Sequence, residues 1–202
     1  MFRTFIGMKF SIFEGVRKFF MQFVEKDKLF SLEAYLAFEE ASETRHELYQ
    51  GNLIEMSGTT TIHNEIVGNI YMILRNFLKG ADWKVYSENI KIGIGENTFF
   101  YPDVIVSKPF ENQYISRIPV LVVEVLSKST RQFDLTDKFI QYRKIETLHY
   151  YLWVEPEQQV VIFFFKNENG EWLSETYTKD EDKIDLKMLN TFFTLRDIYK
   201  PE

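Results

Sequence analysis

Two acidic residues stand inside hydrophobic runs and are the first candidates for chemistry. Asp103 lies in YPDVIVS and Glu124 in PVLVVEVLS, and such apolar runs are typical of strands at the centre of a sheet. A buried charge is costly unless a partner compensates it. If the two segments are neighbouring strands, opposed side chains lie about 5 Å apart, so a proton or a cation must separate the carboxylates. Two carboxylates suit Mg²⁺, which also binds waters and substrate phosphate, and the pair predicts a site for phosphodiester chemistry.

A simpler interpretation stands beside this one. Pro-Asp is a common turn dipeptide, so Asp103 can also lie at the mouth of a strand, in solvent and without a chemical role. Glu124 is the sharper signal. It is surrounded by apolar residues on both sides, which predicts a central strand whose single acid needs a partner.

The cation for this site is expected from the next helix, DLTDKFIQYRKI. Lys138 follows Leu135 by three residues and precedes Tyr142 by four, so the three share one helix face. We expect Lys138 at the edge of the buried side, where it can orient water or stabilise developing phosphate charge. The alternative is that its side chain extends along the surface and pairs with Asp134 one turn earlier.

The surrounding elements follow from periodicity and turn signals. Segment 31–42 predicts a helix with Ser31 as its N-cap, and segment 46–58 predicts a hairpin that turns at Gln50-Gly51-Asn52. Segment 61–80 predicts the clearest helix, ended by Gly80. Its expected apolar face is Ile62, Ile66, Ile70, Ile73, Leu74 and Phe77. Strands are expected in 83–94, 101–107, 119–127, 149–156, 159–167 and 171–178. A buried central strand pair with flanking helices indicates an α/β fold, a mixed β-sheet flanked by helices.

Composition limits the classes of function. The 202-residue chain is 45% hydrophobic and 27% charged, which is typical of a folded globular protein. Its net charge of −6 argues against a protein that coats nucleic acid, although bound metal or a local basic rim can offset the acids. It has no cysteine, which excludes disulfides and thiolate chemistry. Three histidines without metal spacing argue against zinc, and a cytoplasmic location is expected.

The first 28 residues differ from the rest. Apolar residues between Ile12 and Phe23 follow helical spacing, which predicts an amphipathic extension of 1–28 before a domain of 29–202. This extension is expected to pack on the domain or on a partner subunit; the alternative is a helix on a membrane surface. Translation can also start at Met8 or Met21. The longest apolar run, VVIFFF, is far too short to span a membrane.

Several segments together resemble a known family. RHELYQGNLIEMSGTTTIHNEIVGNI, YPDVIV, PVLVVEVLSKSTRQFDLTDKFIQYRK and YYLWVEPE are similar to the Uma-two family, a group of proposed restriction endonucleases in the PD-(D/E)XK nuclease superfamily. The resemblance covers roughly 30–200 and keeps the family's order of motifs. It implies a restriction-endonuclease-like core.

The resemblance also implies roles for single residues. Asp103 matches the first acid of the superfamily and Glu124 the second, with the Val125 carbonyl as a further metal ligand. Glu47 of RHEL resembles an upstream glutamate that often completes the site; the alternative is a strand-end acid paired with Arg45. The superfamily's lysine, two residues after the second acid, is replaced here by Leu126. Lys138 is the cation that members of this family would then use.

Other polar residues rank lower. His63 is either a substrate contact or a residue of the first helical turn, and His46 and His149 are expected at strand ends or in loops. The SKSTR segment, with Lys128 and Arg131, could hold a phosphate or form a polar loop.

These observations favour a Mg²⁺-dependent nuclease, with Mn²⁺ able to substitute and DNA as the favoured partner. A homo-oligomer, a dimer first, is expected, and no membrane partner. The alternative from another class is a catalytically inactive, oligomeric interaction module that keeps the nuclease fold. Hydrolysis of a smaller phosphate ester would use the same chemistry.

Overall fold

The computed structural model describes residues 29–56, 58–127 and 131–201. Their contacts divide them into two compact units. The first holds the described residues up to Met56 together with Gly95–Phe99, and the second holds the remainder. The expected extension of 1–28 and the question of the start site lie outside the described residues. Among the residues described, no helix is long and apolar enough to cross a membrane.

The first unit is a helix and a hairpin, as the sequence predicts. Its elements are α2 (Leu32–Ala41), β1 (His46–Tyr49) and β2 (Asn52–Glu55). The Ser31 hydroxyl caps α2 by accepting a hydrogen bond from the Ala34 amide at 3.3 Å. Tyr49 pairs with Asn52, so the turn is the two residues Gln50 and Gly51 alone. Both have positive φ, 51° and 83°, as two-residue hairpin turns require.

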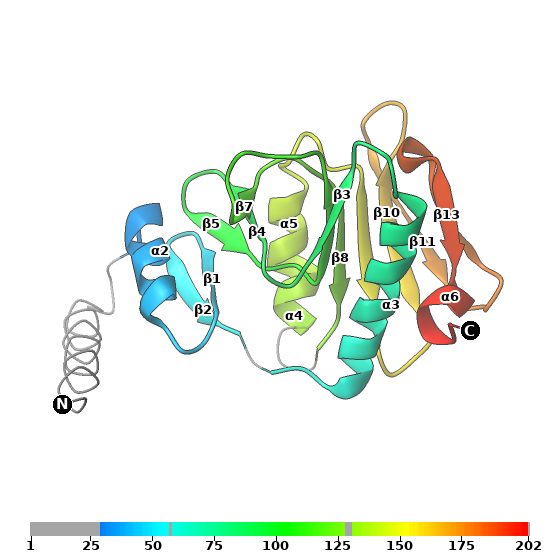
Figure 1. The fold of residues 1–202 in the computed structure, drawn as a ribbon, viewed down its shortest axis with the longest axis horizontal. Helices are drawn as coiled ribbons and strands as arrows, with labels where there is room; N and C mark the ends of the chain where they lie inside the picture. Colours follow the sequence, from blue (N-terminus) through cyan, green and yellow to red (C-terminus); the bar gives the residue numbers. More distant parts are fainter. Residues whose placement is uncertain (1–28, 57, 128–130, 202) are drawn as a thin grey trace, which may run out of the picture. The chain divides into compact units, whose positions relative to one another are not determined.

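The second unit is built on a six-stranded sheet of order β11-β10-β9-β8-β6-β3 (Figure 1). Its strands are β3 (Lys84–Ser87), β6 (Val104–Ser107), β8 (Pro119–Val125), β9 (Tyr150–Val154), β10 (Val161–Lys166) and β11 (Trp172–Tyr177). β8 runs parallel to β9, whereas the other neighbouring pairs are antiparallel. The sheet is therefore mixed, as expected.

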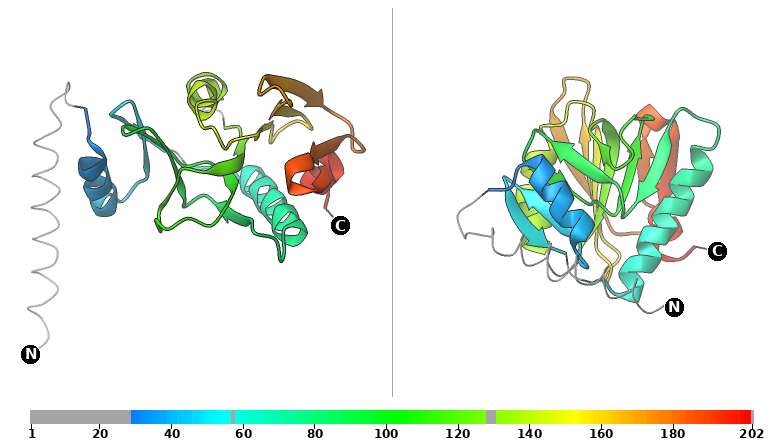
Figure 2. Two further views of the ribbon diagram at one scale, coloured as in Figure 1. Left: turned by 90° about the horizontal axis from the view of Figure 1, so that it is seen from above. Right: turned by 60° about the vertical axis from the view of Figure 1, so that its left-hand side comes forward.

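Helices cover both faces of this sheet. Figure 2 shows α3 (Thr61–Phe77) on one face and a segmented helix on the other. The segments are α4 (Arg131–Phe133), the π-helical turn η1 (Asp134–Lys138) and α5 (Phe139–Tyr142). All seven residues of β8 are buried, because the strand is central and both of its faces are covered. Leu121, Val123 and Val125 join the core that includes Ile66 and Ile70 of α3.

The buried face of α3 differs from the expected one. Ile62 and Phe77 are 50% and 58% exposed, whereas His63 and Val67 are buried with Ile66, Ile70 and Leu74. The stripe on the sheet is thus rotated toward His63. Hydrophobic spacing alone chose the larger apolar residues at both helix ends, but a hydrogen bond, described below, draws His63 inward.

Two further elements differ from expectation. The helix expected over 134–145 begins at Arg131 and ends at Tyr142, and it contains the π turn. The strand expected over 83–94 is divided into β3 and β4 (Lys91–Ile94), with Glu88 between them at a φ of 56°. β4 pairs in parallel with β7 (Ile115–Ser116), a short strand without a sequence signal.

The C-terminal elements were not predicted. β12 (Lys183–Leu186) and β13 (Thr191–Thr194) form an antiparallel hairpin around the 3₁₀ turn η2 (Lys187–Leu189), and α6 (Leu195–Tyr199) follows. The Thr194 side chain and the Asp197 carboxylate form a reciprocal cap at the start of α6. β5 (Thr98–Phe100), which pairs with β1 through Leu48 and Phe99, was also unassigned.

Candidate active site

The two acids come from neighbouring strands, as the sequence predicts. β6 and β8 are antiparallel, and Val104 pairs with Val123, so the next step along the ladder leads to Asp103 and Glu124. Asp103 itself lies just before β6, and its side chain is 17% exposed. Its Oδ2 accepts a hydrogen bond from the Val125 amide at 2.7 Å. Asp103 is therefore at a strand mouth, as the simpler interpretation held, but it is anchored to the strand that carries Glu124.

His63 completes the contacts of the Val125 peptide. Its Nε2 lies 2.8 Å from the Val125 carbonyl oxygen and 3.5 Å from Oδ2 of Asp103. A carbonyl oxygen only accepts, so Nε2 carries the hydrogen. Burial lowers the pKa of His63, but the hydrogen bond and charge of Asp103 with the Val125 carbonyl outweigh it, and the pKa is raised. Thus both polar groups of the Val125 peptide are held by side chains.

Glu124 and Lys138 form a buried ion pair. The Lys138 Nζ lies 3.3 Å from Oε1 of Glu124, and the two side chains are 4% and 5% exposed. The Tyr142 hydroxyl donates to the same Oε1 at 2.9 Å. The Lys138 Nζ also lies 3.0 Å from Oδ1 of Asp134. The functional interpretation of Lys138 and the simple pairing with Asp134 are therefore both realised.

Lys138 is wholly buried rather than at the edge expected. The π turn adds a residue to the helix, and both Asp134 and Lys138 at its ends are buried. The ammonium lies 5.6 Å from the centre of the Phe100 ring, close enough for a cation–π contact. Its position is thus fixed by aromatic packing as well as by charge.

The cluster carries more negative than positive charge. One ammonium lies between two carboxylates, so Glu124, Asp134 and Lys138 together have a formal charge of −1. Burial, followed by the charge of Glu124, raises the pKa of the nearby Tyr151 hydroxyl well above its ordinary value. A further cation in this region would therefore be stabilised.

Three of the four predicted side chains, Asp103, Glu124 and Lys138, belong to the second unit. Glu47 belongs to the first, where it is buried in β1 opposite Ile54, so its membership of the site stays a prediction. Leu126 is 2% exposed, and the position where the superfamily places lysine is a core position here.

The other polar candidates have structural partners. His46 begins β1, with Nδ1 3.3 Å from Oε2 of Glu39, and His149 lies in the loop before β9. Residues 128–130 of SKSTR are outside the described ranges. Arg131 forms a two-pronged ion pair with Glu155.

The ligands that this site offers fit one kind of metal ion. Nowhere in the described ranges do three or more His, Asp or Glu side chains gather as a metal site. The candidate ligands are therefore two carboxylates, Asp103 and Glu124, and the Val125 carbonyl. Mg²⁺ commonly takes one or two carboxylates and completes its shell with waters and substrate phosphate, so this small set fits Mg²⁺ better than an ion that needs a full protein cage.

Sequence reasoning missed the functional importance of three residues. Asp134 and Tyr142 were visible as neighbours of Lys138 at a spacing of four residues, but only as an alternative partner and a sheet-facing ring. His63 gave no signal for its bond to Val125, because that contact joins residues 62 positions apart.

Comparison with known proteins extends the geometry. Residues 32–196 match the Uma2 family, described as "Putative restriction endonuclease". Two relatives from Synechocystis sp. are the uncharacterized proteins slr1290 and sll1609. The first is 31% identical over 84% of this chain and 91% of its own length, and the second is 30% identical over 76% and 90%.

A solved structure shares the fold. It is a crystal structure described as a "putative nuclease belonging to DUF820" from Anabaena variabilis, with a TM-score of 0.71 and 16% identity over 84% of this chain and 97% of that chain. The fold is thus restriction-endonuclease-like, as the motifs predicted. Because the family profile covers most of the chain, the chain belongs to the Uma2 (Uma-two) family.

Proposed function

We propose that the chain is a Mg²⁺-dependent nuclease that hydrolyses phosphodiester bonds of nucleic acid, with DNA as the favoured substrate and Mn²⁺ able to replace Mg²⁺. The observation that supports the proposal most is the contact between Lys138 and Glu124 at 3.3 Å. A lysine from the following helix pairs with the second acid although residue 126 is leucine. The family description points to the same activity.

Asp103, Glu124 and the Val125 carbonyl would hold the ion, and Glu47 is a further proposed member. When bound, Mg²⁺ lowers the pKa of a coordinated water and polarises the phosphodiester. Asp103 has the more accessible carboxylate of the pair, at 17% side-chain exposure against 5% for Glu124. We therefore assign Asp103 to the side that faces substrate.

The remaining residues hold these ligands in place. His63 and Asp103 fix the Val125 peptide from its two sides, and Tyr142 fixes Oε1 of Glu124. Lys138 is almost fully buried, so its first role is to keep Glu124 ionised and oriented. The role predicted from sequence, orienting the attacking water, requires its ammonium to reach the substrate side. In the reaction, the water oxygen bonds to phosphorus and one ester P–O bond breaks, leaving a terminal phosphate and a hydroxyl that takes its proton from solvent.

The test is cleavage of plasmid, single-stranded DNA and RNA with Mg²⁺ or Mn²⁺. Asp103→Asn and Glu124→Gln preserve shape and remove charge, and we expect each to slow cleavage at least about a hundredfold. Glu181→Gln, at an exposed position, is the matched control and should cleave as wild type does. Equal rates in all four proteins would show that the activity belongs to another site or to a contaminant.

Metal binding provides an independent test by calorimetry. Mn²⁺ should bind the wild-type chain, and Glu124→Gln should weaken that binding by about 10- to 100-fold. If no divalent ion binds, the nuclease proposal fails, and the interaction module that keeps this fold becomes the better account.

A further inference from the structure

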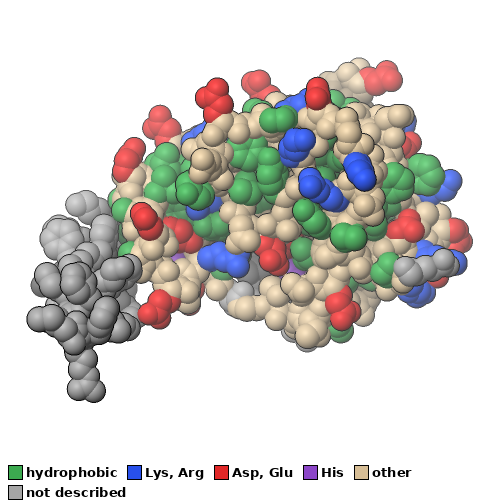
Figure 3. Space-filling view, viewed as in Figure 1, with side chains coloured by type: hydrophobic (Ala, Val, Ile, Leu, Met, Phe, Trp, Pro, Cys, Tyr) green, Lys and Arg blue, Asp and Glu red, His purple; other side chains and the backbone are tan. Residues whose placement is uncertain are grey.

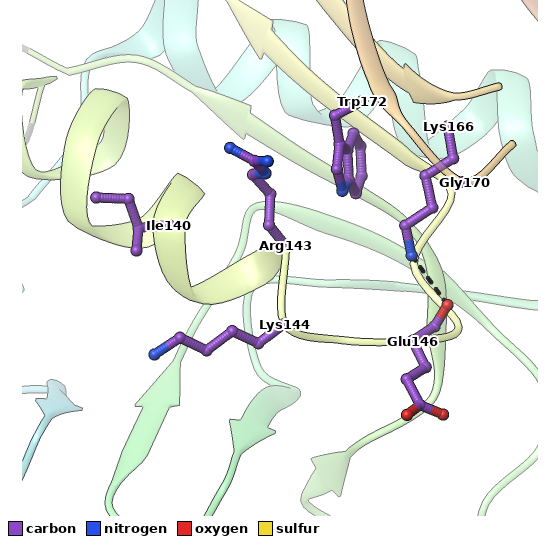
Figure 4. A pocket seen from close by; sticks show the side chains of 7 residues that line it. All are labelled: Ile140, Arg143, Lys144, Glu146, Lys166, Gly170 and Trp172. Atoms are coloured by element: carbon purple, nitrogen blue, oxygen red, sulfur yellow. Dashed lines mark hydrogen bonds between the residues drawn. The ribbon is translucent and has the colours of Figure 1, made fainter.

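A basic hollow lies apart from the candidate active site, at the C-terminal end of α5. It has a volume of about 430 Å³ and is shown in Figure 4. Its walls come from α5 and the turn after it, from the end of β10, and from the start of β11 with the preceding turn. The lining residues are Ile140, Arg143, Lys144, Glu146, Lys166, Gly170 and Trp172.

The hollow concentrates positive charge in an acidic chain. It contains three cations and one carboxylate, whereas the whole chain has a net charge of −6. Arg143, Lys144 and Lys166 form no ion pair with any residue that the structure describes. On the face shown in Figure 3, by contrast, Lys and Arg side chains are interspersed with acids. The unneutralised cations of the hollow therefore suit an anionic ligand.

Lys166 is held in place on the wall. Its Nζ donates to the carbonyls of Ile145 at 3.3 Å and Glu146 at 3.0 Å, and a lysine ammonium has three N–H donors. One donor therefore remains for a ligand. The same Nζ lies 5.4 Å from the centre of the Trp172 ring.

Arg143 and Trp172 combine charge with an aromatic surface. In Figure 4 the Arg143 side chain extends toward the indole of Trp172, whereas Lys144 points away from it. Fixed cations beside an aromatic ring are the combination with which proteins bind single-stranded nucleic acid. The cations contact phosphates, and bases stack on the ring.

The hollow also lies within reach of the candidate active site. The same helical segment presents Lys138 and Tyr142 to the interior and the exposed Arg143 to solvent. Lys166 bonds to His149, which bonds to Val120 at the start of β8. Val120 is four residues before Glu124, a distance of roughly 13 Å along the strand. A nucleic-acid strand at the site could thus extend to the hollow.

We propose that this hollow binds the phosphates and an unpaired base of a single-stranded nucleic-acid segment and so holds the substrate beside the active site. The inference rests on the proposed action on nucleic acid. Arg143 and Lys166 contact phosphate, Lys144 adds charge at the rim, and Trp172 stacks on the base.

The test is binding of a fluorescently labelled single-stranded oligonucleotide to the full chain in EDTA, followed by anisotropy over a range of salt concentrations. Arg143→Ala/Lys144→Ala should weaken binding about tenfold and reduce the slope of log K against log salt by about 1.4, at roughly 0.7 for each lost phosphate contact. The matched control is Lys183→Ala/Lys187→Ala, which removes two exposed lysines of β12 and η2. It should change affinity less than about twofold.

Trp172 variants test base recognition. Trp172→Ala should weaken oligonucleotide binding about tenfold, and Trp172→Phe, which keeps an aromatic ring, should recover most of it. Equal losses in the basic pair and in its control would overturn the proposal, as would an absence of wild-type binding. A heparin fragment that binds as tightly as the oligonucleotide, with the same dependence on Arg143 and Trp172, would replace it with a general polyanion surface.

This outcome is separable from that of the nuclease proposal, because no metal is present and no cleavage is measured. Cleavage without dependence on the hollow would overturn only the hollow. Binding through the hollow without metal-dependent cleavage would overturn only the nuclease.

Discussion

Replacement of Lys138 by methionine is the most direct test of the buried charge cluster. Methionine is similar in length and can keep packing beside Phe100, but it lacks the ammonium that lies 3.3 Å from Glu124 and 3.0 Å from Asp134. Lys138→Met therefore leaves two buried carboxylates without their cation. The fold must then accommodate two like charges in a region that is 4–5% exposed.

The magnitude follows from these distances. With an effective dielectric constant of about 20, unit charges about 3.3 Å apart attract by about 5 kcal/mol. Desolvation of the ammonium offsets part of this attraction, and removal of one partner from a buried pair typically costs about 3–5 kcal/mol. We expect Lys138→Met to lower the free energy of unfolding by that amount near neutral pH.

The assay is urea unfolding followed by tryptophan fluorescence. Lys138→Met should lower the midpoint by more than about 1 M. Lys144→Met, an exposed lysine six residues later, should change stability by less than about 0.5 kcal/mol. The double variant Lys138→Met/Asp134→Asn removes one of the two acids and should recover at least about 1 kcal/mol.

Two results would refute this reasoning. If Lys138→Met unfolds at the same urea concentration as Lys144→Met, the ammonium does not compensate buried carboxylates. If the double variant is no more stable than Lys138→Met, Asp134 is not part of the cluster.

Three further predictions concern single contacts. Tyr142→Phe removes the donor to Glu124 and should lower the free energy of unfolding by about 1.5–3 kcal/mol, measured in urea. Hydrogen bonds from Lys200 lower the pKa of Asp180, so their stabilising effect is present above the unfolded pKa and lost as pH falls through the folded one. Asp180→Asn should therefore lower the melting temperature at neutral pH but not below about pH 3. Gly51→Ala should destabilise by about 1–2 kcal/mol in urea, because φ is +83° and a Cβ would lie 2.7 Å from the Cβ of Leu29.

Each contact has a control. Tyr114→Phe, at a position 64% exposed, should leave the urea midpoint unchanged, and an equal loss there would remove the argument for Tyr142. The effect of Asp180→Asn should shrink at high salt because the pair is exposed; a salt-independent loss would contradict an electrostatic cause. Gly58→Ala meets no atom within 4 Å and should be tolerated. If it destabilises as much as Gly51→Ala, turn conformation is not the reason.

Much of the second unit could be predicted from sequence, because its signals are local. The apolar runs around Asp103 and Glu124 predicted neighbouring central strands, and β6 and β8 are neighbours. Helical spacing predicted α3, and a turn signal predicted the Gln50-Gly51 hairpin. The C-terminal hairpin was missed, because strands as short as Lys183–Leu186 and Thr191–Thr194 alternate over too few residues to stand out.

The candidate site was predictable in its members but not in its arrangement. Sequence alone nominated Asp103, Glu124 and Lys138, since acids in apolar strands and a cation on the next helix are visible in one dimension. It placed Lys138 at an edge, whereas the π turn places it inside, between Glu124 and Asp134. A helix of regular period gives no sign of an inserted residue.

Tertiary structure alone decided the contacts that join distant segments. The bond from His63 to the Val125 carbonyl and the basic hollow formed by Arg143, Lys166 and Trp172 depend on which faces meet when helices pack on the sheet. Periodicity determines that a residue lies on a buried or an exposed face, because it reflects geometry within one element. It carries no information on which residue of another element lies opposite, because that is set by the packing of the whole sheet and its helices.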